Sequence, residues 1–385
     1  MKKPKSLLLS ARAILIVSLM LSYLFPYCLS ENYSYSYQLL DSPNGSKHYK
    51  LNLAVSQGLY DYYKEKSHNL NAINDFAKFV TPYALKPIAD SLWQIYANDE
   101  DFVNGVLMMV HQITYEETFS AKYPVETIVE NKGDCDLFSY VAASIIVAGG
   151  LDVVLLHYES ETHMNIGVSL SHTPRDAREQ AYCVTYSDIR YYVAECTIVG
   201  NWQSGWRVGE CPYDLRNASV QIVTLENREQ WAPGQISAGY ENLEPSTISL
   251  NVSPEYLMQE GTATISGQLS PALQNENVTI YVKVNNTPWT VLGTAVTNSG
   301  GWFTYVWRTE TAGICYIRAS WSGSGIHAGA DSLARTVTIV SLFFISLLAI
   351  TVTLACVGVV LFFLSRHAQR ETLEPQLPQP MEVPS

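Results

Sequence analysis

The chain has 385 residues, 47% of them hydrophobic and 16% charged, and a formal net charge of −12 at pH 7. This length allows two domains, and the composition is typical of a globular protein that carries membrane segments. The acidic balance argues against nucleic-acid partners, because binding to phosphate groups needs a basic surface.

The N-terminus has the pattern of a targeting segment. Basic residues, the last of them Arg12, precede the uncharged run Ala13–Phe25. This run is short for a membrane span and typical of a secretory signal. We therefore expect residues 1–30 to be a signal peptide, with an uncleaved N-terminal anchor as the alternative, and residues 31–240 to form the first domain.

Two helices are predicted in the first domain. Asn98 and Asp99 can cap a helix from about Asp101 to Ile113, which has an apolar stripe. The second helix, over Leu137–Val147, is apolar or small at almost every position and must be buried nearly all round. Gly149 and Gly150 end it.

Strands are expected after the helices, so the predicted class of this domain is α+β, with a central buried helix on an antiparallel sheet. The predicted strands are Asp152–Leu156, Met164–Val168, Ala181–Tyr186 and Tyr191–Thr197.

Cys135 stands between two aspartates in the stretch NKGDCDLFSY, at the first turn of the predicted buried helix. The helix dipole there favours an anion by about 1 kcal/mol, which cannot outweigh two flanking acids. A base is therefore needed to activate the thiol. The best candidate is His163, because the alternation of its strand turns residues 163, 165 and 167 away from the apolar positions.

A catalytic histidine of this kind needs a group that orients its second nitrogen. Glu195 is a carboxylate within an otherwise apolar strand, where a charge is costly without a partner. Its neighbour Cys196 could form a disulfide with Cys183, and Cys211 is an alternative partner. No Cys-x-x-Cys or His-x-x-x-His pair indicates a metal site, and nothing indicates a cofactor.

A second domain is expected after the polar, proline-containing break at Glu241–Ser246. Residues 246–340 contain short β-branched and aromatic runs separated by Asn, Ser and Gly turns, which is typical of a β-sandwich. The pattern resembles the immunoglobulin-like spacer domains of prokaryotic surface proteins.

The segment Ser341–Leu364 has no charged residue and is long enough to cross a membrane. Arg366 and Arg370 follow it, which places residues 365–385 in the cytoplasm by the positive-inside rule. We therefore expect a single-pass protein of the cell membrane with most of its chain on the extracytoplasmic side.

Four segments together resemble the transglutaminase-like superfamily, in particular its prokaryotic branch with transglutaminase-like cysteine proteinases. The likeness spans roughly Tyr35 to Pro212. The segments are YPVETIVENKGDC (Tyr123–Cys135), GGLDVVLL (Gly149–Leu156), HMNIGV (His163–Val168) and YYVAECT (Tyr191–Thr197).

The resemblance implies a papain/transglutaminase-like core in which Cys135 is the nucleophile, His163 the base and Glu195 the acidic third member. It also implies that Gln112 donates to the oxyanion together with the backbone N–H of Cys135. The family often reads Gly-Asp-Cys-Glu-Asp here, whereas this chain has Leu137 at the last position.

These observations predict an enzyme that forms a thioester on Cys135 from an amide of a protein or peptide substrate. Hydrolysis and transamidation use the same residues and stay open. The alternative is a non-catalytic surface protein that uses the same fold for adhesion or binding.

Overall fold

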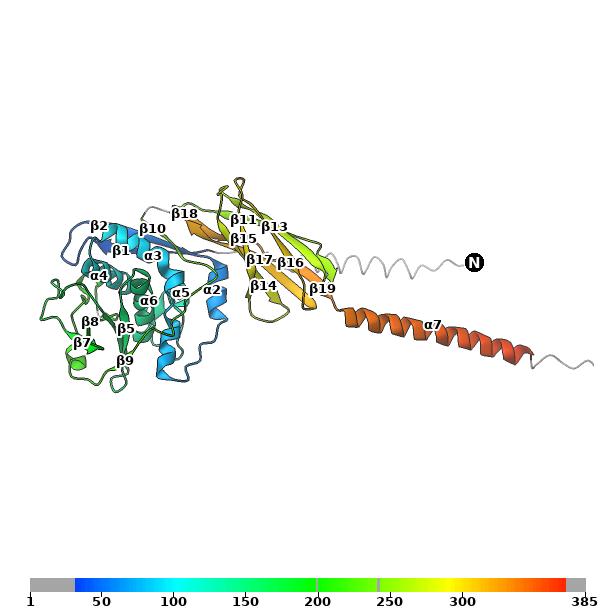
Figure 1. Ribbon diagram of the computed structural model, residues 1–385, viewed down its shortest axis with the longest axis horizontal. Coiled ribbons are helices and arrows are strands. Elements are labelled where there is room, and N and C mark those ends of the chain that lie inside the picture. The colour runs from blue at the N-terminus through cyan, green and yellow to red at the C-terminus, as the bar shows by residue number, and fades with distance from the viewer. Residues whose placement is uncertain (1–31, 199, 241–242, 372–385) are drawn as a thin grey trace, which may run out of the picture.

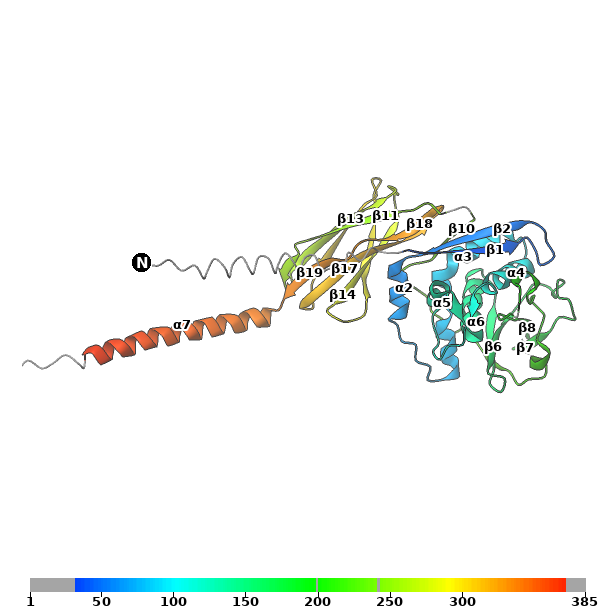
Figure 2. The same ribbon diagram turned by 180° about the vertical axis from the view of Figure 1, so that it is seen from behind.

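The computed structural model describes residues 32–198, 200–240 and 243–371 (Figure 1). The predicted signal segment, residues 1–30, lies outside the described residues. An N-terminal part of mixed helices and strands lies beside a β-sandwich, and a long helix leads away from the sandwich (Figures 1 and 2).

The N-terminal part begins with a hairpin, continues through helices and closes with a second sheet. Its elements are β1 (Tyr33–Leu40), β2 (His48–Val55), α2 (Gln57–Lys64), η1 (Ile73–Phe79), α3 (Pro82–Ile95), α4 (Asp99–Val110), β3 (Thr114–Tyr115), α5 (Pro124–Glu130), β4 (Lys132–Gly133), α6 (Cys135–Ala148), β5 (Val153–Tyr158), β6 (His163–Val168), β7 (Cys183–Tyr186), β8 (Ile189–Ala194), η2 (Trp202–Ser204), η3 (Tyr213–Leu215), β9 (Gln221–Val223) and β10 (Ser237–Gly239).

Helix α6 is the centre of this part and is buried from Leu137 to Ile146. It packs on an antiparallel sheet with the strand order β7-β8-β6-β5-β9. Met164 and Ile166 of β6 join the core around α6. The opposite face of the sheet has a smaller apolar cluster of its own. Both faces of the sheet are therefore covered by apolar side chains.

The other sheet of the N-terminal part pairs β1, β2 and β10. Strand β10 comes almost at the end of this part in the sequence, and its Ser237–Gly239 pairs with β2. The hairpin and the last strand therefore close the N-terminal part around its helices, and α3 packs against β10.

The β-sandwich consists of two sheets with the orders β11-β13-β16 and β12-β19-β17-β14-β15, and β18 pairs with β17. Its core includes Trp321 and Phe303, both almost fully buried. Its strands are β11 (Thr247–Ser253), β12 (Tyr256–Met258), β13 (Thr262–Ser270), β14 (Asn277–Val284), β15 (Thr290–Val296), β16 (Trp302–Arg308), β17 (Gly313–Ser324), β18 (His327–Asp331) and β19 (Arg335–Val340).

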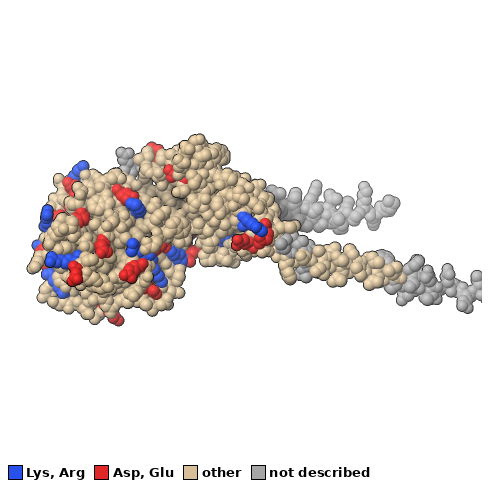
Figure 3. Space-filling view, in the orientation of Figure 1, with Lys and Arg blue, Asp and Glu red and all other residues tan. Residues whose placement is uncertain are grey.

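Polar contacts join the two parts at α2, which lies at their junction in both ribbon views (Figures 1 and 2). Asp331 of β18 accepts hydrogen bonds from the backbone N–H of Gly58, at 3.3 and 3.2 Å to its two oxygens. Arg318 of β17 forms an ion pair with Asp61 at 3.0 Å. The N-terminus of α2, whose N-cap is Ser56, therefore receives a further acceptor from the sandwich. In the face shown in Figure 3, charged side chains gather over the N-terminal part.

The predicted fold class is wrong. Among the described elements, the strands β1 to β19 outnumber the helices, and the N-terminal part does not run from helices to one sheet, because the β1-β2 hairpin precedes the helices and β10 completes its sheet.

The predicted transmembrane helix is also wrong. Helix α7 (Leu342–Glu371) follows the sandwich. Within the residues that the structure describes, no helix combines the length and the apolar character that crossing a membrane requires. Two further predictions depended on Ser341–Leu364 as a membrane span: a single-pass localisation in the cell membrane, and the membrane as a partner. Both are wrong for the same reason.

Candidate active site

Cys135 is the first residue of α6, and Asp134 is the N-cap of that helix. The thiol is free and half-buried. Its sulfur lies 4.0 Å from the backbone oxygen of Thr162, in the turn between β5 and β6. The end of a buried helix thus presents the sulfur to the start of β6, where His163 is the first residue.

His163 and Glu195 meet through the pairing of β6 with β8. Ile166 is opposite Ala194 in this antiparallel pair. The next residue beyond Ala194 is Glu195, and its Oε2 lies 2.9 Å from His163 Nε2. Cys135 interacts with the same imidazole, since its side chain is among the groups that raise the pKa of His163. The structure brings together the three residues that the sequence suggests as nucleophile, base and orienting acid.

The environment of His163 favours its protonated form. Burial alone lowers the pKa of an imidazole, but hydrogen bonds to Cys135 and Glu195 and the charge of Glu195 outweigh it and raise the pKa of His163 to about 10. An imidazolium beside the sulfur can hold a thiolate as an ion pair.

Glu195 is fully buried, and both of its carboxylate oxygens are used. Oε1 accepts from the backbone N–H of Thr197 at 2.9 Å and from the Thr197 hydroxyl. Oε2 accepts from Asn165 Nδ2 at 3.0 Å as well as from His163. Burial raises the pKa of Glu195, but the hydrogen bond and charge of His163 and the other donors keep it below its ordinary value. These hydrogen bonds hold the buried Glu195 carboxylate in its charged form next to the imidazole of His163.

The two acids beside Cys135 share a proton. Asp134 Oδ2 accepts from the backbone N–H and the hydroxyl of Thr118, both at 2.8 Å. Burial, and then the hydrogen bond and charge of Asp134, raise the pKa of Asp136 to about 8. Asp136 therefore stays protonated at neutral pH, and its hydrogen bond to Asp134 helps to keep the pKa of Asp134 below its ordinary value. Only one negative charge then flanks the thiol.

Gln112 does not join these residues. Its Oε1 accepts from the backbone N–H of Gln38 at 2.9 Å. Its Nε2 donates to the backbone oxygens of Gln38 and Met108, both at 2.8 Å. Both amide hydrogens are used, so in this arrangement Gln112 has no donor free for an oxyanion. Of the two oxyanion donors that the sequence suggests, the backbone N–H of Cys135 at the start of α6 remains.

Cys183, Cys196 and Cys211 are all free thiols. In the β7-β8 pair, Cys183 is opposite Tyr192, whereas Cys196 follows the end of β8 and is buried against the core of α6. The disulfides considered from the sequence are absent from the described residues.

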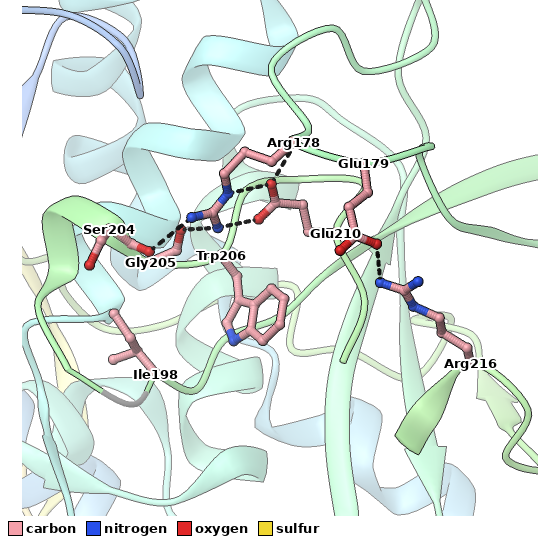
Figure 4. Close-up of a pocket in the computed structure, with 8 residues that line it drawn as sticks. All are labelled: Arg178, Glu179, Ile198, Ser204, Gly205, Trp206, Glu210 and Arg216. Atoms are coloured by element: carbon pink, nitrogen blue, oxygen red, sulfur yellow. Dashed lines mark hydrogen bonds and ion pairs between the residues drawn. The ribbon is translucent and has the colours of Figure 1, made fainter. Parts of the chain in front are cut away.

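A pocket of about 500 Å³ lies beyond the end of β8 (Figure 4). Its charged side chains already pair with each other: Arg178 with Glu210 at 2.5 Å and Arg216 with Glu179 at 2.5 Å. Trp206 stands between these pairs. Cys135 and His163 do not line this pocket. The pocket is therefore not part of the candidate active site.

The sequence interpretation missed Asn165 and Thr197, which hold Glu195, and the sharing of a proton between Asp134 and Asp136. Asn165 carried a usable signal, because it occupies the same face of β6 as His163. The proton sharing had no signal in the sequence, since it depends on how the fold buries this site and brings the two side chains together.

No family model and no curated protein matches the chain. Among solved structures, it is similar to the sulfur carrier protein SoxY from Chlorobium limicola f thiosulfatophilum, at 13% identity over 26% of this chain and 84% of that chain. It is also similar to a CARDB domain from Pyrococcus furiosus in complex with di-metal ions, at 14% identity over 25% of this chain and 93% of that chain. Both TM-scores are 0.18, too low for an argument about fold or function, and neither protein is transglutaminase-like.

Proposed function

We propose that this protein is a transglutaminase-like cysteine enzyme that transfers an acyl group from an amide, either a peptide bond or a glutamine side chain, through a thioester on Cys135. The observation that supports this most strongly is the environment of His163. Its imidazole forms a hydrogen bond with the buried Glu195 and interacts with the side chain of Cys135. Burial of an unpaired carboxylate lowers the stability of a folded protein. The pairing of Glu195 with His163 offsets that cost and orients the imidazole.

In the proposed reaction the Cys135 sulfur attacks the amide carbon and the carbonyl oxygen becomes an oxyanion. The proposed donor to that charge is the backbone N–H of Cys135, at the N-terminus of α6. The C–N bond breaks as His163 gives its proton to the leaving nitrogen. Glu195 keeps the imidazole oriented and stabilises its charged form before that transfer.

The thioester then reacts with water or with an amine. Water gives a carboxylic acid and completes a hydrolysis, whereas the amine of a lysine gives a new amide and a cross-link. In both cases His163 takes the proton of the attacking group, and the thiolate leaves. The two outcomes use the same three residues, so products must distinguish them.

The test is to incubate the purified full-length protein with a peptide library and a labelled primary amine, and to identify products by mass spectrometry. We expect new carboxylates, ammonia release or amine adducts that are absent with Cys135→Ala. If the wild-type protein and Cys135→Ala give the same products, the proposed enzyme function is wrong, and a binding role takes its place.

A further inference from the structure

A short loop is fixed beside the proposed nucleophile by two sets of contacts. Tyr115 of β3 is opposite Gly133 of β4, two residues before Cys135. The backbone N–H of Glu116 donates to the Gly133 oxygen at 2.7 Å. Thr118 is bound to Asp134 through both its backbone and its hydroxyl. Residues 115–119, which we call the aromatic loop, are therefore held against the start of α6.

This loop presents two aromatic side chains to solvent. Tyr115 is 53% exposed and Phe119 is more exposed than in an extended chain, at 111%. The Tyr115 ring meets the edge of the buried Phe138, with centroids 6.3 Å apart. Tyr115 is also near enough to Cys135 for the charge of that group to affect its own pKa, which burial and then Cys135 raise. The loop therefore offers two exposed aromatic rings within five residues of each other.

The β5-β6 turn reaches the other side of the sulfur, because Cys135 approaches the backbone oxygen of Thr162. Glu161 in this turn has a buried carboxylate oxygen without a hydrogen-bond partner among the described residues. Glu117 in the aromatic loop has no ion pair among the described residues. Its neighbour Glu116, by contrast, forms an ion pair with Lys132 at 2.6 Å. The two segments beside Cys135 thus carry two exposed aromatic rings and two glutamates, Glu117 and Glu161, without an ion pair among the described residues.

From this placement we infer that the aromatic loop is a substrate subsite for peptides: Tyr115 and Phe119 pack against a large apolar side chain close to the residue that Cys135 attacks, and Glu117 and Glu161 favour basic residues flanking it. The occupant is a peptide, because an apolar side chain combined with nearby cationic groups matches both features of the surface. The inference rests on the proposed function, since it concerns the substrate of the same site.

The test compares the full-length wild-type protein with Phe119→Ala and Tyr115→Ala on a random peptide library, with products read by mass spectrometry. We expect the wild type to enrich Phe, Tyr or Leu at one position near the reacting residue by about tenfold or more over Ser. Phe119→Ala reduces this enrichment to about threefold or less and raises KM more than it lowers kcat. Tyr256→Ala is the matched control, because Tyr256 is 75% exposed in the sandwich.

Labelling of Cys135 by iodoacetamide distinguishes a failure of the proposed subsite from a failure of the proposed enzyme function. Phe119→Ala is expected to label as fast as the wild type, since the loop contacts substrate and not the base. Products without an apolar preference, or a preference that survives in both loop variants, overturn the subsite and leave the enzyme function standing. Absence of products together with slow labelling of the wild type overturns both.

Discussion

Asp134 and Asp136, the acids on either side of Cys135, are hydrogen-bonded to each other through one shared proton. A thiol between two aspartates is expected to resist ionisation, because each carboxylate repels a thiolate. Sharing the proton removes one of these charges at neutral pH, and His163 supplies a positive charge on the other side of the sulfur. The local sequence thus gives a misleading picture of the local charge.

Asp136→Asn is expected to make the reactivity of Cys135 less sensitive to alkaline pH. The pKa of Asp136 is raised to about 8, so the wild-type residue gains a negative charge above that pH. Asparagine stays neutral and can still donate to Asp134. Iodoacetamide labelling is expected to be similar in both proteins at pH 6.5 and about two- to tenfold faster in the variant at pH 9.

The same substitution has a signature in stability. A folded-state pKa raised above the ordinary 3.8 gives a contribution that is fully present below 3.8 and is lost as pH rises through about 8. The advantage of Asp136→Asn in urea denaturation is therefore expected to grow between these limits. Identical pH profiles for the two proteins, in labelling and in unfolding, are incompatible with a shared proton.

Glu195→Gln is expected to weaken the folded state most in mildly acidic solution. The pKa of His163 is raised from 6.5, so its contribution is full below 6.5 and is lost as pH rises through about 10. The pKa of Glu195 is lowered from 4.5, so its contribution is present above 4.5 and is lost as pH falls further. The pair is therefore strongest between pH 4.5 and 6.5.

In that window the substitution is expected to lower the free energy of unfolding by about 3 kcal/mol, because it breaks a buried ion pair. Urea denaturation at pH 5.5 and pH 10 measures the difference, which should shrink at the higher pH. The control is Glu226→Gln, an exposed residue. A cost that is independent of pH would mean that His163 and Glu195 are not an ion pair.

Asp331→Ala is expected to destabilise the junction between the two parts of the protein. It removes the acceptor for the Gly58 N–H at the start of α2. Loss of such a cap costs about 1–2 kcal/mol. Asp331→Asn keeps an acceptor and is expected to cost less. An unchanged urea midpoint in Asp331→Ala would show that the sandwich does not support α2.

The parts of the fold that follow from local pattern were the predictable ones. Helix α6 lies over the run predicted as a buried helix, because apolar side chains on every face leave it no other environment. Strand β1 has alternating tyrosine and serine residues, a period-two pattern that is typical of a strand. The pairing of β10 with β2 joins residues far apart in the sequence, and no local pattern encodes it. An uncharged run at Ser341–Leu364 was not sufficient evidence of a membrane span.

In the candidate site, too, the residues with a local sequence signal were predictable and the roles that depend on tertiary contacts were not. Cys135, His163 and Glu195 were suggested by a helix start, a strand face and a costly buried acid, all of them local features. Two of the three hydrogen bonds of the Gln112 side chain are with Gln38 of β1, 74 residues away, so its role could not be judged from its own neighbourhood. The state of Asp136 depends on its burial against Asp134, which is a tertiary property.

The most direct test of the central claim is the rate at which iodoacetamide labels Cys135 at neutral pH in the wild type and in His163→Ala. An ion pair between the sulfur and the imidazole predicts labelling of the wild type faster than that of a free thiol such as glutathione, and loss of this excess in the variant. Equal rates in the two proteins would contradict an activated nucleophile and the enzyme function built on it.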